Sequence, residues 1–229
     1  MTDFHTHILP GIDDGAKDVN MSLEMLRAQQ KQGVTRIFLT PHFYPNEQSL
    51  EDFLKDRENA FRELKKYISV FAEQELLSID LRLGAEVYYF PGISDARLLK
   101  KVAMEGAEAI LVEPPMEHFK DDMLDDIESI YGNLGLIPVI AHVDRYCRVI
   151  GDYSFFDALE GRKIMAQCNT SFFVNVKTGD EAFRYLKEGR IHLLGSDCHN
   201  LENRVPNFGY ALNAAKTRGM EKEFIKVAG

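Results

Sequence analysis

Histidine and acidic side chains recur at the C-terminal ends of short apolar segments, and this regularity constrains the fold more than any other feature. Seven segments have the length and apolar character of β-strands: residues 3–8, 36–40, 81–89, 109–113, 137–142, 165–169 and 191–196. Amphipathic segments of helical period lie between them. This alternation predicts an α/β fold whose mostly parallel sheet is curled into a barrel, and 229 residues suit one domain spanning 1–229.

The longest expected helix begins after Ser49, where Asp52 completes an S-x-x-D start signal. Apolar side chains then recur at three- and four-residue spacings: Leu50, Phe53, Leu54, Phe61, Leu64, Ile68 and Phe71. The stripe predicts packing against the core, not a cofactor-binding segment. An earlier helix is expected to end near Gly33.

Two histidines near the N-terminus have the spacing of metal ligands. His5 and His7 are two residues apart, so both side chains point to the same face of an extended strand. Six further candidates lie in or just after later strand segments: His42, Glu86, Glu113, His142, Asp197 and His199. The C-terminal ends of parallel strands share one edge, where active sites gather. We therefore expect a site for several metal ions, and its nitrogen and oxygen donors favour Mn, Fe or Zn.

Other polar residues have simpler interpretations. His192 is interpreted as structural, whereas the role of His118, near a helix start, stays ambiguous. An acidic helical face is interpreted as solvated, and its members are Asp121, Asp122, Asp125 and Asp126.

Composition excludes several classes of function. The net charge of −9 disfavours a surface that grips nucleic acid. No apolar run approaches the roughly 18 residues of a membrane span, and no export signal is recognised. Three widely spaced cysteines, Cys147, Cys168 and Cys198, predict reduced thiols and a cytoplasmic location.

Three segments resemble one known superfamily. They are DFHTHILPGIDDGAKD near the N-terminus, AHVDRY around His142, and SDCHNLENRVP after Ser196. Together they resemble the polymerase-and-histidinol-phosphatase (PHP) superfamily, and in particular the bacterial manganese-dependent tyrosine phosphatases encoded beside capsular and extracellular polysaccharide genes. The resemblance extends from residue 2 to about residue 206, and the HILPGIDDGA segment is specific to this branch.

The resemblance implies a distorted (β/α)7 barrel and a cluster of three divalent ions, with Mn preferred and Fe or Zn possible. The first ion would be bound by His5, His7, Glu86 and Asp197. The second would share Glu86 and add Glu113 and His142. The third would be bound by Asp14, His42 and His199. A water activated to hydroxide between adjacent ions would attack phosphorus.

The resemblance also implies roles in substrate binding, because Arg145 and Arg204 match the phosphate-binding arginines. A phenolic leaving group needs little protonation, and Asp14 and His42 are kept as candidates for a general acid. The substrate would be the phosphotyrosine tail of a polysaccharide-biosynthesis kinase. Val143 and Asp144 replace the Pro-Glu pair usual in the family, and the segment after Met220 is short.

Four alternatives remain open from the sequence. Cys198 and Arg204 have the C-x5-R spacing of cysteine-dependent tyrosine phosphatases, although no glycine lies between them and Glu202 would repel phosphate. A metal-dependent amidohydrolase also opens with H-x-H, but usually needs a lysine at a strand end. The others are a histidinol-phosphate phosphatase and an inactive metal-binding regulator. Without a functional role, Arg204 would pair with Glu202, and Arg145 with Asp144.

Overall fold

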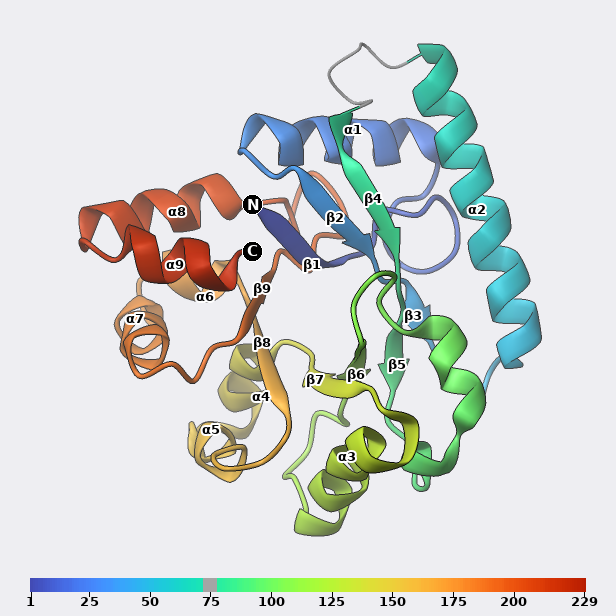
Figure 1. The fold of residues 1–229 in the computed structure, drawn as a ribbon. Helices are drawn as coiled ribbons and strands as arrows, with labels where there is room; N and C mark the ends of the chain where they lie inside the picture. Colours follow the sequence, from blue (N-terminus) through green and yellow to red (C-terminus); the bar gives the residue numbers. More distant parts are fainter. Residues whose placement is uncertain (72–77) are drawn as a thin grey trace.

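Parallel strands form the centre of the molecule. The structure is a computed structural model that describes residues 1–71 and 78–229, without the side chain of Phe71. One sheet has the order β1 (Thr2–Thr6), β2 (Arg36–Leu39), β4 (Asp80–Leu83). The other has the order β3 (His42–Phe43), β5 (Glu86–Tyr88), β6 (Ala109–Glu113), β7 (Ile137–Ile140), β8 (Met165–Asn169), β9 (Leu193–Gly195). The α/β class and the curled parallel sheet agree with the sequence prediction (Figure 1).

The chain itself joins the two sheets at two bends. Strand β2 continues into β3 through Thr40, and β4 continues into β5 through Gly84. A single strand over residues 81–89 was therefore a wrong prediction. Gly84 donates its N–H to Leu39 O at 2.9 Å, and a Cβ there would lie 3.1 Å from the Thr40 side chain. The two bends pack against each other, and this long-range contact has no signal in the local apolar pattern.

Backbone hydrogen bonds also connect the first strand to the segment after the last. Asp197 N donates to His5 O at 2.8 Å, and His7 N donates to Cys198 O at 3.0 Å. The sheet thus curls until β1 meets the end of β9. Because of the bends, the described residues form nine strand segments and not seven strands.

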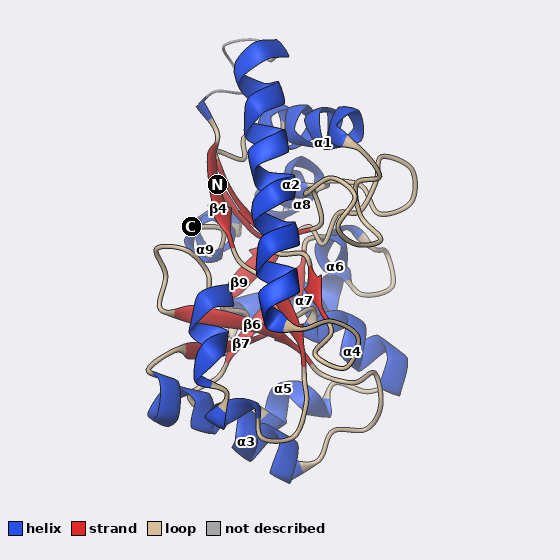
Figure 2. Ribbon diagram, turned by 90° about the vertical axis from the view of Figure 1, so that its right-hand side faces the viewer, coloured by secondary structure: helices blue, strands red, loops and turns tan. Residues whose placement is uncertain are grey.

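Helices follow most of the strands and cover the outside of the curled sheet (Figure 2). They are α1 (Val19–Lys31), α2 (Leu50–Phe71), α3 (Asp121–Leu134), α4 (Val143–Ile150), α5 (Ser154–Ala158), α6 (Ser171–Val174), α7 (Gly179–Lys187), α8 (Phe208–Thr217) and α9 (Glu221–Val227). Two 3₁₀ segments, η2 (Ile93–Asp95) and η3 (Arg97–Val102), precede β6. Among residues 1–71 and 78–229, no helix is long and apolar enough to cross a membrane.

The two predicted helix signals are present. Ser49 Oγ accepts from Asp52 N at 3.1 Å at the start of α2, and Phe53 and Leu64 on its inner face are fully buried. Phe71, the last member of the predicted stripe, ends α2, but its side chain lies outside the described residues. Gly33 directly follows Gln32, the C-cap of α1, in a left-handed conformation (φ 83°), where glycine is favoured.

Close packing of β9 on β1 predicts that Gly195→Ala lowers the free energy of unfolding by about 1–3 kcal/mol. An added Cβ would lie 2.5 Å from His5 Cβ and 2.8 Å from Gln167 Nε2. Urea unfolding measures the change. The control is Gly132→Ala in α3, where an added Cβ meets nothing within 4 Å. Equal stability of the two variants would contradict the packing argument.

Candidate metal centre

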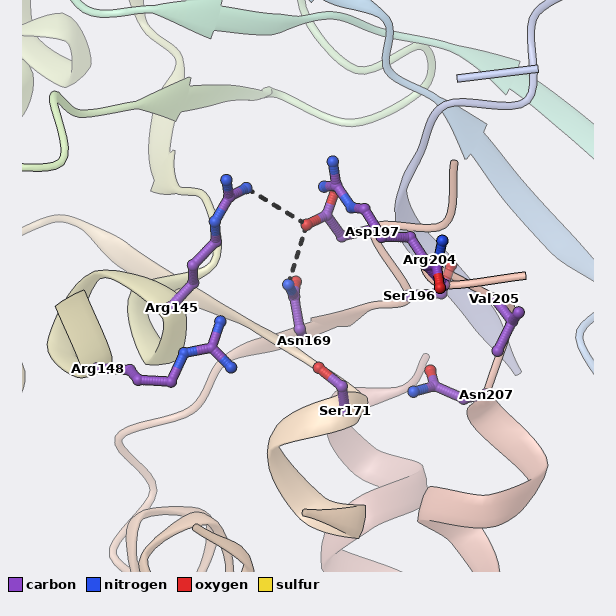
Figure 3. A pocket seen from close by; sticks show the side chains of 10 residues that line it. Arg145, Arg148, Asn169, Ser171, Ser196, Asp197, Arg204, Val205 and Asn207 are labelled. Atoms are coloured by element: carbon purple, nitrogen blue, oxygen red, sulfur yellow. Dashed lines mark hydrogen bonds and ion pairs between the residues drawn. The ribbon is translucent and has the colours of Figure 1, made fainter. Parts of the chain in front are cut away.

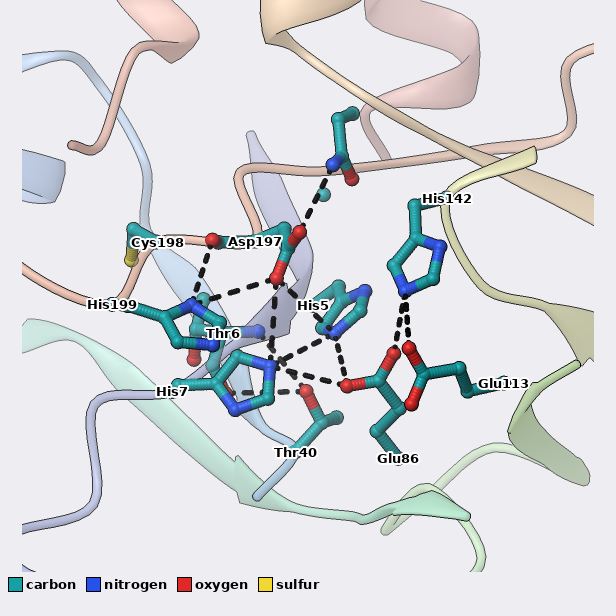
Figure 4. Close-up of polar contacts among 12 residues, drawn as sticks. His5, Thr6, His7, Thr40, Glu86, Glu113, His142, Asp197, Cys198 and His199 are labelled. Atoms are coloured by element: carbon teal, nitrogen blue, oxygen red, sulfur yellow. Dashed lines mark hydrogen bonds and ion pairs between the residues drawn. The ribbon is translucent and has the colours of Figure 1, made fainter. Parts of the chain in front are cut away.

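Histidine and carboxylate side chains from many strands meet at the C-terminal edge of the sheet (Figure 4). His5 lies on β1 and His7 directly follows it, and both are fully buried. Their Nε2 atoms are 3.1 Å apart. The same-face prediction for this pair is confirmed, although β1 ends at Thr6, before His7.

The Glu86 carboxylate lies at the centre of the cluster. Its Oε2 is 3.1 Å from His5 Nε2 and 3.3 Å from His7 Nε2. The same atom is 3.0 Å from His42 Nδ1, while Oε1 is 2.9 Å from His142 Nε2. Burial alone would raise the pKa of the Glu86 carboxyl group, but the surrounding imidazoles lower that pKa by a larger amount. The pKa therefore lies well below its usual range.

Three other carboxylates surround this centre. Glu113 Oε1 lies 3.3 Å from His142 Nε2, and Asp197 Oδ1 lies 3.5 Å from His7 Nε2. Asp14, whose side chain is 65% exposed, approaches His199 Nε2 at 3.2 Å and His42 Nε2 at 3.5 Å. The structure therefore brings together all nine predicted metal ligands, which reach this edge from β1, β3, β5, β6 and the loops after β1, β7 and β9.

Within the cluster, three overlapping groups offer donor atoms close enough to share an ion. They are His5, His7 and Glu86; His42, Glu86 and Glu113; and His7, Asp14, His42 and His199. His142 faces Glu86 and Glu113 from the other side. Neighbouring groups share Glu86, His7 or His42, so ions bound there would be adjacent.

Several buried atoms of the cluster lie close to other donors and acceptors, yet form no hydrogen bond with any of the described residues, which fits metal ligation. They include His42 Nδ1, Glu86 Oε2 and His199 Nε2. A shared ion about 2.1 Å from each donor would hold the donors about 3.0–3.4 Å apart, close to the separations observed. Burial and the neighbouring His7 lower the pKa of His199 to about 4.

Two of the candidate ligands have unusual backbone geometry. His142 (φ 32°) and Asp197 (φ 51°) are the non-glycine residues with positive φ in the described parts of the chain. The prediction that His142 ends a strand was wrong, because β7 ends at Ile140 and His142 precedes α4. Left-handed backbone costs of order 1–3 kcal/mol, and such strain clusters at functional sites.

Sequence reasoning missed Asp13, which orients His7. Asp13 Oδ2 lies 2.7 Å from His7 Nδ1 and accepts from His42 N at 3.1 Å. Although burial opposes both shifts, this pairing lowers the pKa of Asp13 to about 2 and contributes to raising that of His7 to about 10. A carboxylate on the second ring nitrogen fixes the tautomer and direction of a ligand histidine. The sequence signal that could have indicated this role is the pair of adjacent acidic residues, Asp13 and Asp14.

Two amides on β8 were also missed. Gln167 Oε1 accepts from His142 N at 2.7 Å and lies 3.1 Å from His5 Nδ1. Asn169 Nδ2 donates to Asp197 Oδ2 at 3.0 Å. Because the two residues are two apart along a buried strand, their side chains lie on the same face. Both therefore face the cluster and hold its ligands in place.

Both candidate arginines point towards the cluster. Arg204 Nη2 lies 2.6 Å from Asp197 Oδ1, and Arg145 Nη1 lies 3.9 Å from Asp197 Oδ2 (Figure 3). Within the described residues, the alternative pairs of Arg204 with Glu202 and of Arg145 with Asp144 are not formed. Asp144 instead accepts from Asn169 N at 2.7 Å.

The thiol of Cys198 is poorly placed to be a nucleophile. Its side chain is fully buried, with Sγ 3.6 Å from Gln29 Nε2, and burial raises its pKa. Reactive cysteines are partly exposed and have lowered pKa values. The geometry therefore opposes a mechanism based on the C-x5-R spacing.

His192 has a structural contact, as interpreted from the sequence: its Nδ1 accepts from Ala166 N at 3.0 Å. His118, which the sequence left ambiguous, is exposed. The prediction for Asp126 was wrong. This residue is partly buried and accepts from Gly92 N at 2.7 Å and from Ser94 Oγ at 2.6 Å, thereby fixing η2 on α3.

Comparison with known proteins gives consistent matches along the chain. A family described as "Capsular polysaccharide synthesis, CpsB/CapC" matches residues 1–227. Tyrosine-protein phosphatase YwqE of Bacillus subtilis is 27% identical over 231 residues, covering 98% of this chain and 85% of the relative. Tyrosine-protein phosphatase CpsB of Streptococcus pneumoniae is 26% identical, covering 97% and 93% respectively. A solved structure also shares the fold, with a TM-score of 0.83 at 24% identity, covering 99% of this chain and 91% of that chain. It comes from work on YwqE of Bacillus subtilis and CpsB of Streptococcus pneumoniae, described there as unique metal-dependent tyrosine phosphatases.

Manganese ions are expected to raise the midpoint of thermal unfolding, because an ion bound only by the folded chain stabilises it by about 2.7 kcal/mol at one hundred times its Kd. Thermal scans with Mn²⁺ and with chelator measure the shift. His5→Ala and Asp197→Ala should fold but lose most of it, whereas His118→Ala should keep it. An equal shift in all three variants would exclude the cluster as the binding site.

Proposed function

Because the chain belongs to the CpsB/CapC family of capsular polysaccharide synthesis, we propose that it is a metal-dependent protein-tyrosine phosphatase. The observation that carries the proposal is the cluster centred on Glu86 with two arginines at its border. A phosphate monoester carries a charge of about −1.5 to −2 at neutral pH, and this site concentrates the groups that bind such a charge.

The proposed metal site holds three divalent ions, with Mn preferred and Fe or Zn as alternatives. Its ligands are the nine clustered residues His5, His7, Asp14, His42, Glu86, Glu113, His142, Asp197 and His199. The overlapping donor groups and the unpartnered buried atoms support this set. When bound, such ions supply a water of lowered pKa as the nucleophile and neutralise phosphate oxygens.

The two arginines are proposed to hold the substrate phosphate. Arg145 and Arg204 approach the same carboxylate, Asp197, from two sides, so a phosphate beside it could accept from both guanidinium groups. Planar guanidinium groups form paired, charge-assisted hydrogen bonds with phosphate oxygens. This clamp would orient phosphorus towards the cluster.

A phenol leaving group needs little protonation, because its pKa is near 10. Asp14 and His42 are the proposed candidates for donating that proton. They line a hollow of about 420 Å³ that also includes Tyr44, whose ring stacks on His42 with centroids 5.1 Å apart. A leaving group entering from this side would meet both residues.

Several wider features belong to the proposal. We place the whole chain, residues 1–229, in one phosphoesterase domain, supported by the family match over residues 1–227. The substrate would be the phosphotyrosine tail of a polysaccharide-biosynthesis kinase. Three buried free cysteines fit a reducing cytoplasm.

The alternatives have less support. Histidinol-phosphate phosphatase is not favoured, because the relatives are named as protein-tyrosine phosphatases. An amidohydrolase would require a lysine near the metals, and no lysine forms an ion pair with these carboxylates in the described parts of the chain. An inactive regulator would bind metal without turnover.

The first test compares hydrolysis of a phosphotyrosine peptide and of histidinol phosphate, with Mn²⁺ and with chelator. We expect turnover of the peptide to exceed that of histidinol phosphate and to be lost with chelator. Preference for histidinol phosphate would instead assign the protein a function in small-molecule metabolism. Cys198→Ser is the control and should remain active; loss of its activity with metals still bound would support a cysteine mechanism.

Removing Arg204 should weaken substrate binding more than metal binding. We expect Arg204→Ala to raise KM for the peptide about 10- to 100-fold, since a charge-assisted hydrogen bond contributes about 1.5–3 kcal/mol. Arg204→Lys keeps the charge without the planar fork and should have an intermediate effect. Steady-state kinetics and metal analysis measure both properties. Equal loss of metal and of substrate binding would make Arg204 a structural residue.

A further inference from the structure

A cavity of about 370 Å³ extends from the metal cluster beyond the two phosphate-clamping arginines (Figure 3). Its volume lies in the range of pockets that accept a drug-sized ligand and so exceeds the needs of one phosphate group. Arg145 and Arg204 line it near Asp197, and Arg148 lines it further along α4. Part of the cavity is therefore unused by the proposed phosphate clamp.

The cavity carries more positive than negative charge. Three arginines line it, but Asp197 is its one lining carboxylate among the described residues, and Arg204 already contacts it at 2.6 Å. Arg148 is exposed, and none of the ion pairs formed within residues 1–71 and 78–229 includes it. A guanidinium group without a carboxylate partner, facing a cavity, is suited to bind an anion from solution.

Helix geometry directs Arg148 to the same side as Arg145. The two residues are three apart on α4, so their side chains are neighbours on one helix face, with Cβ atoms about 5–6 Å apart. Asp144 lies near Arg148, whose charge opposes the rise that burial causes in the pKa of Asp144, but among the described residues it forms no ion pair with either arginine. Its buried Oδ1 instead accepts from Asn169 N. Arg148 can thus reach a group adjacent to a phosphate that Arg145 holds.

Neutral donors complete this part of the cavity. Ser171 begins α6 and presents its hydroxyl group to the cavity, opposite Arg148 (Figure 3). Asn207 Oδ1 accepts from the Thr170 hydroxyl, which leaves the Asn207 amide N–H groups as donors. Hydroxyl and amide donors beside an arginine match the oxygen atoms of a carboxylate or a phosphate.

We infer that Arg148, Ser171 and Asn207 form a second anion site, which selects phosphotyrosine peptides with an acidic side chain close to the phosphotyrosine. The inference rests on the proposed phosphatase function. A peptide advances about 3.3–3.6 Å per residue when extended, so the acidic group lies within two residues of the phosphotyrosine. A glutamate and a second phosphotyrosine present the same oxygen chemistry to this site.

The test measures kcat/KM on matched peptides that carry glutamate, glutamine, lysine or a second phosphotyrosine at each position within two residues of the phosphotyrosine. For the holoenzyme with Mn²⁺, we expect about fivefold preference for glutamate over glutamine at one position, as for an exposed ion pair of about 1 kcal/mol. Arg148→Ala should abolish the preference, and Arg148→Glu should transfer it to lysine. Preference for the doubly phosphorylated peptide over glutamate would identify a phosphate as the favoured occupant.

Arg62→Ala is the matched control, because this exposed arginine lies on α2 and pairs with Glu58. Its preference should equal that of the unchanged protein. Equal loss of activity on all peptides in Arg148→Ala, or an unchanged preference, would overturn the second site. Binding of non-hydrolysable phosphonate analogues of the same peptides decides the matter independently of turnover. No hydrolysis of any peptide by the unchanged protein would instead contradict the phosphatase function, while the binding preference still tests the anion site.

Discussion

One buried carboxylate, Glu86, contacts more of the candidate site's histidines than any single strand could supply. A buried charge costs several kcal/mol unless opposite charges and hydrogen bonds compensate it. Here the compensation comes from histidines on or just after three other strands, β1, β3 and β7. The bends at Thr40 and Gly84 make this possible, because they align His42 and Glu86 as neighbours in the register of β3 and β5. The curl of the sheet therefore brings together the histidines that compensate the Glu86 charge.

Much of this organisation was predictable from local sequence. The strands Ala109–Glu113 and Met165–Asn169 match the predicted ranges at both ends, and the apolar run of Ala109–Val112 is typical of a buried parallel strand. The nine ligand candidates also meet: eight were predicted from their places in or near the strand segments, and Asp14 only from the family resemblance. The bend at Gly84 was not predictable, since its cause is the approach of Thr40 from another strand. Apolar periodicity reports which face is buried and carries no information on such contacts.

The residues that hold the ligands were harder to find than the ligands themselves. Gln167 and Asn169 are uncharged amides in a buried strand, and neither type indicates metal chemistry alone. Their role follows from what they contact, the rings or backbone of two histidines and the carboxylate of Asp197. Asp13 adjoins a predicted ligand, yet sequence alone could not decide which acid of the pair orients His7. Ligands have chemical signatures, whereas the groups that orient them are defined by geometry.

The left-handed backbone at His142 and Asp197 has an evolutionary consequence. Glycine adopts this conformation without the penalty of order 1–3 kcal/mol that other residues incur, so glycine at either position would relax the backbone while deleting a ligand. Selection for durability and selection for catalysis thus oppose each other at these two codons. A gene copy released from the need for activity could drift towards a more stable, inactive protein. Histidine and aspartate at the positions of His142 and Asp197 in a related sequence would therefore indicate a lineage in which catalysis is still maintained.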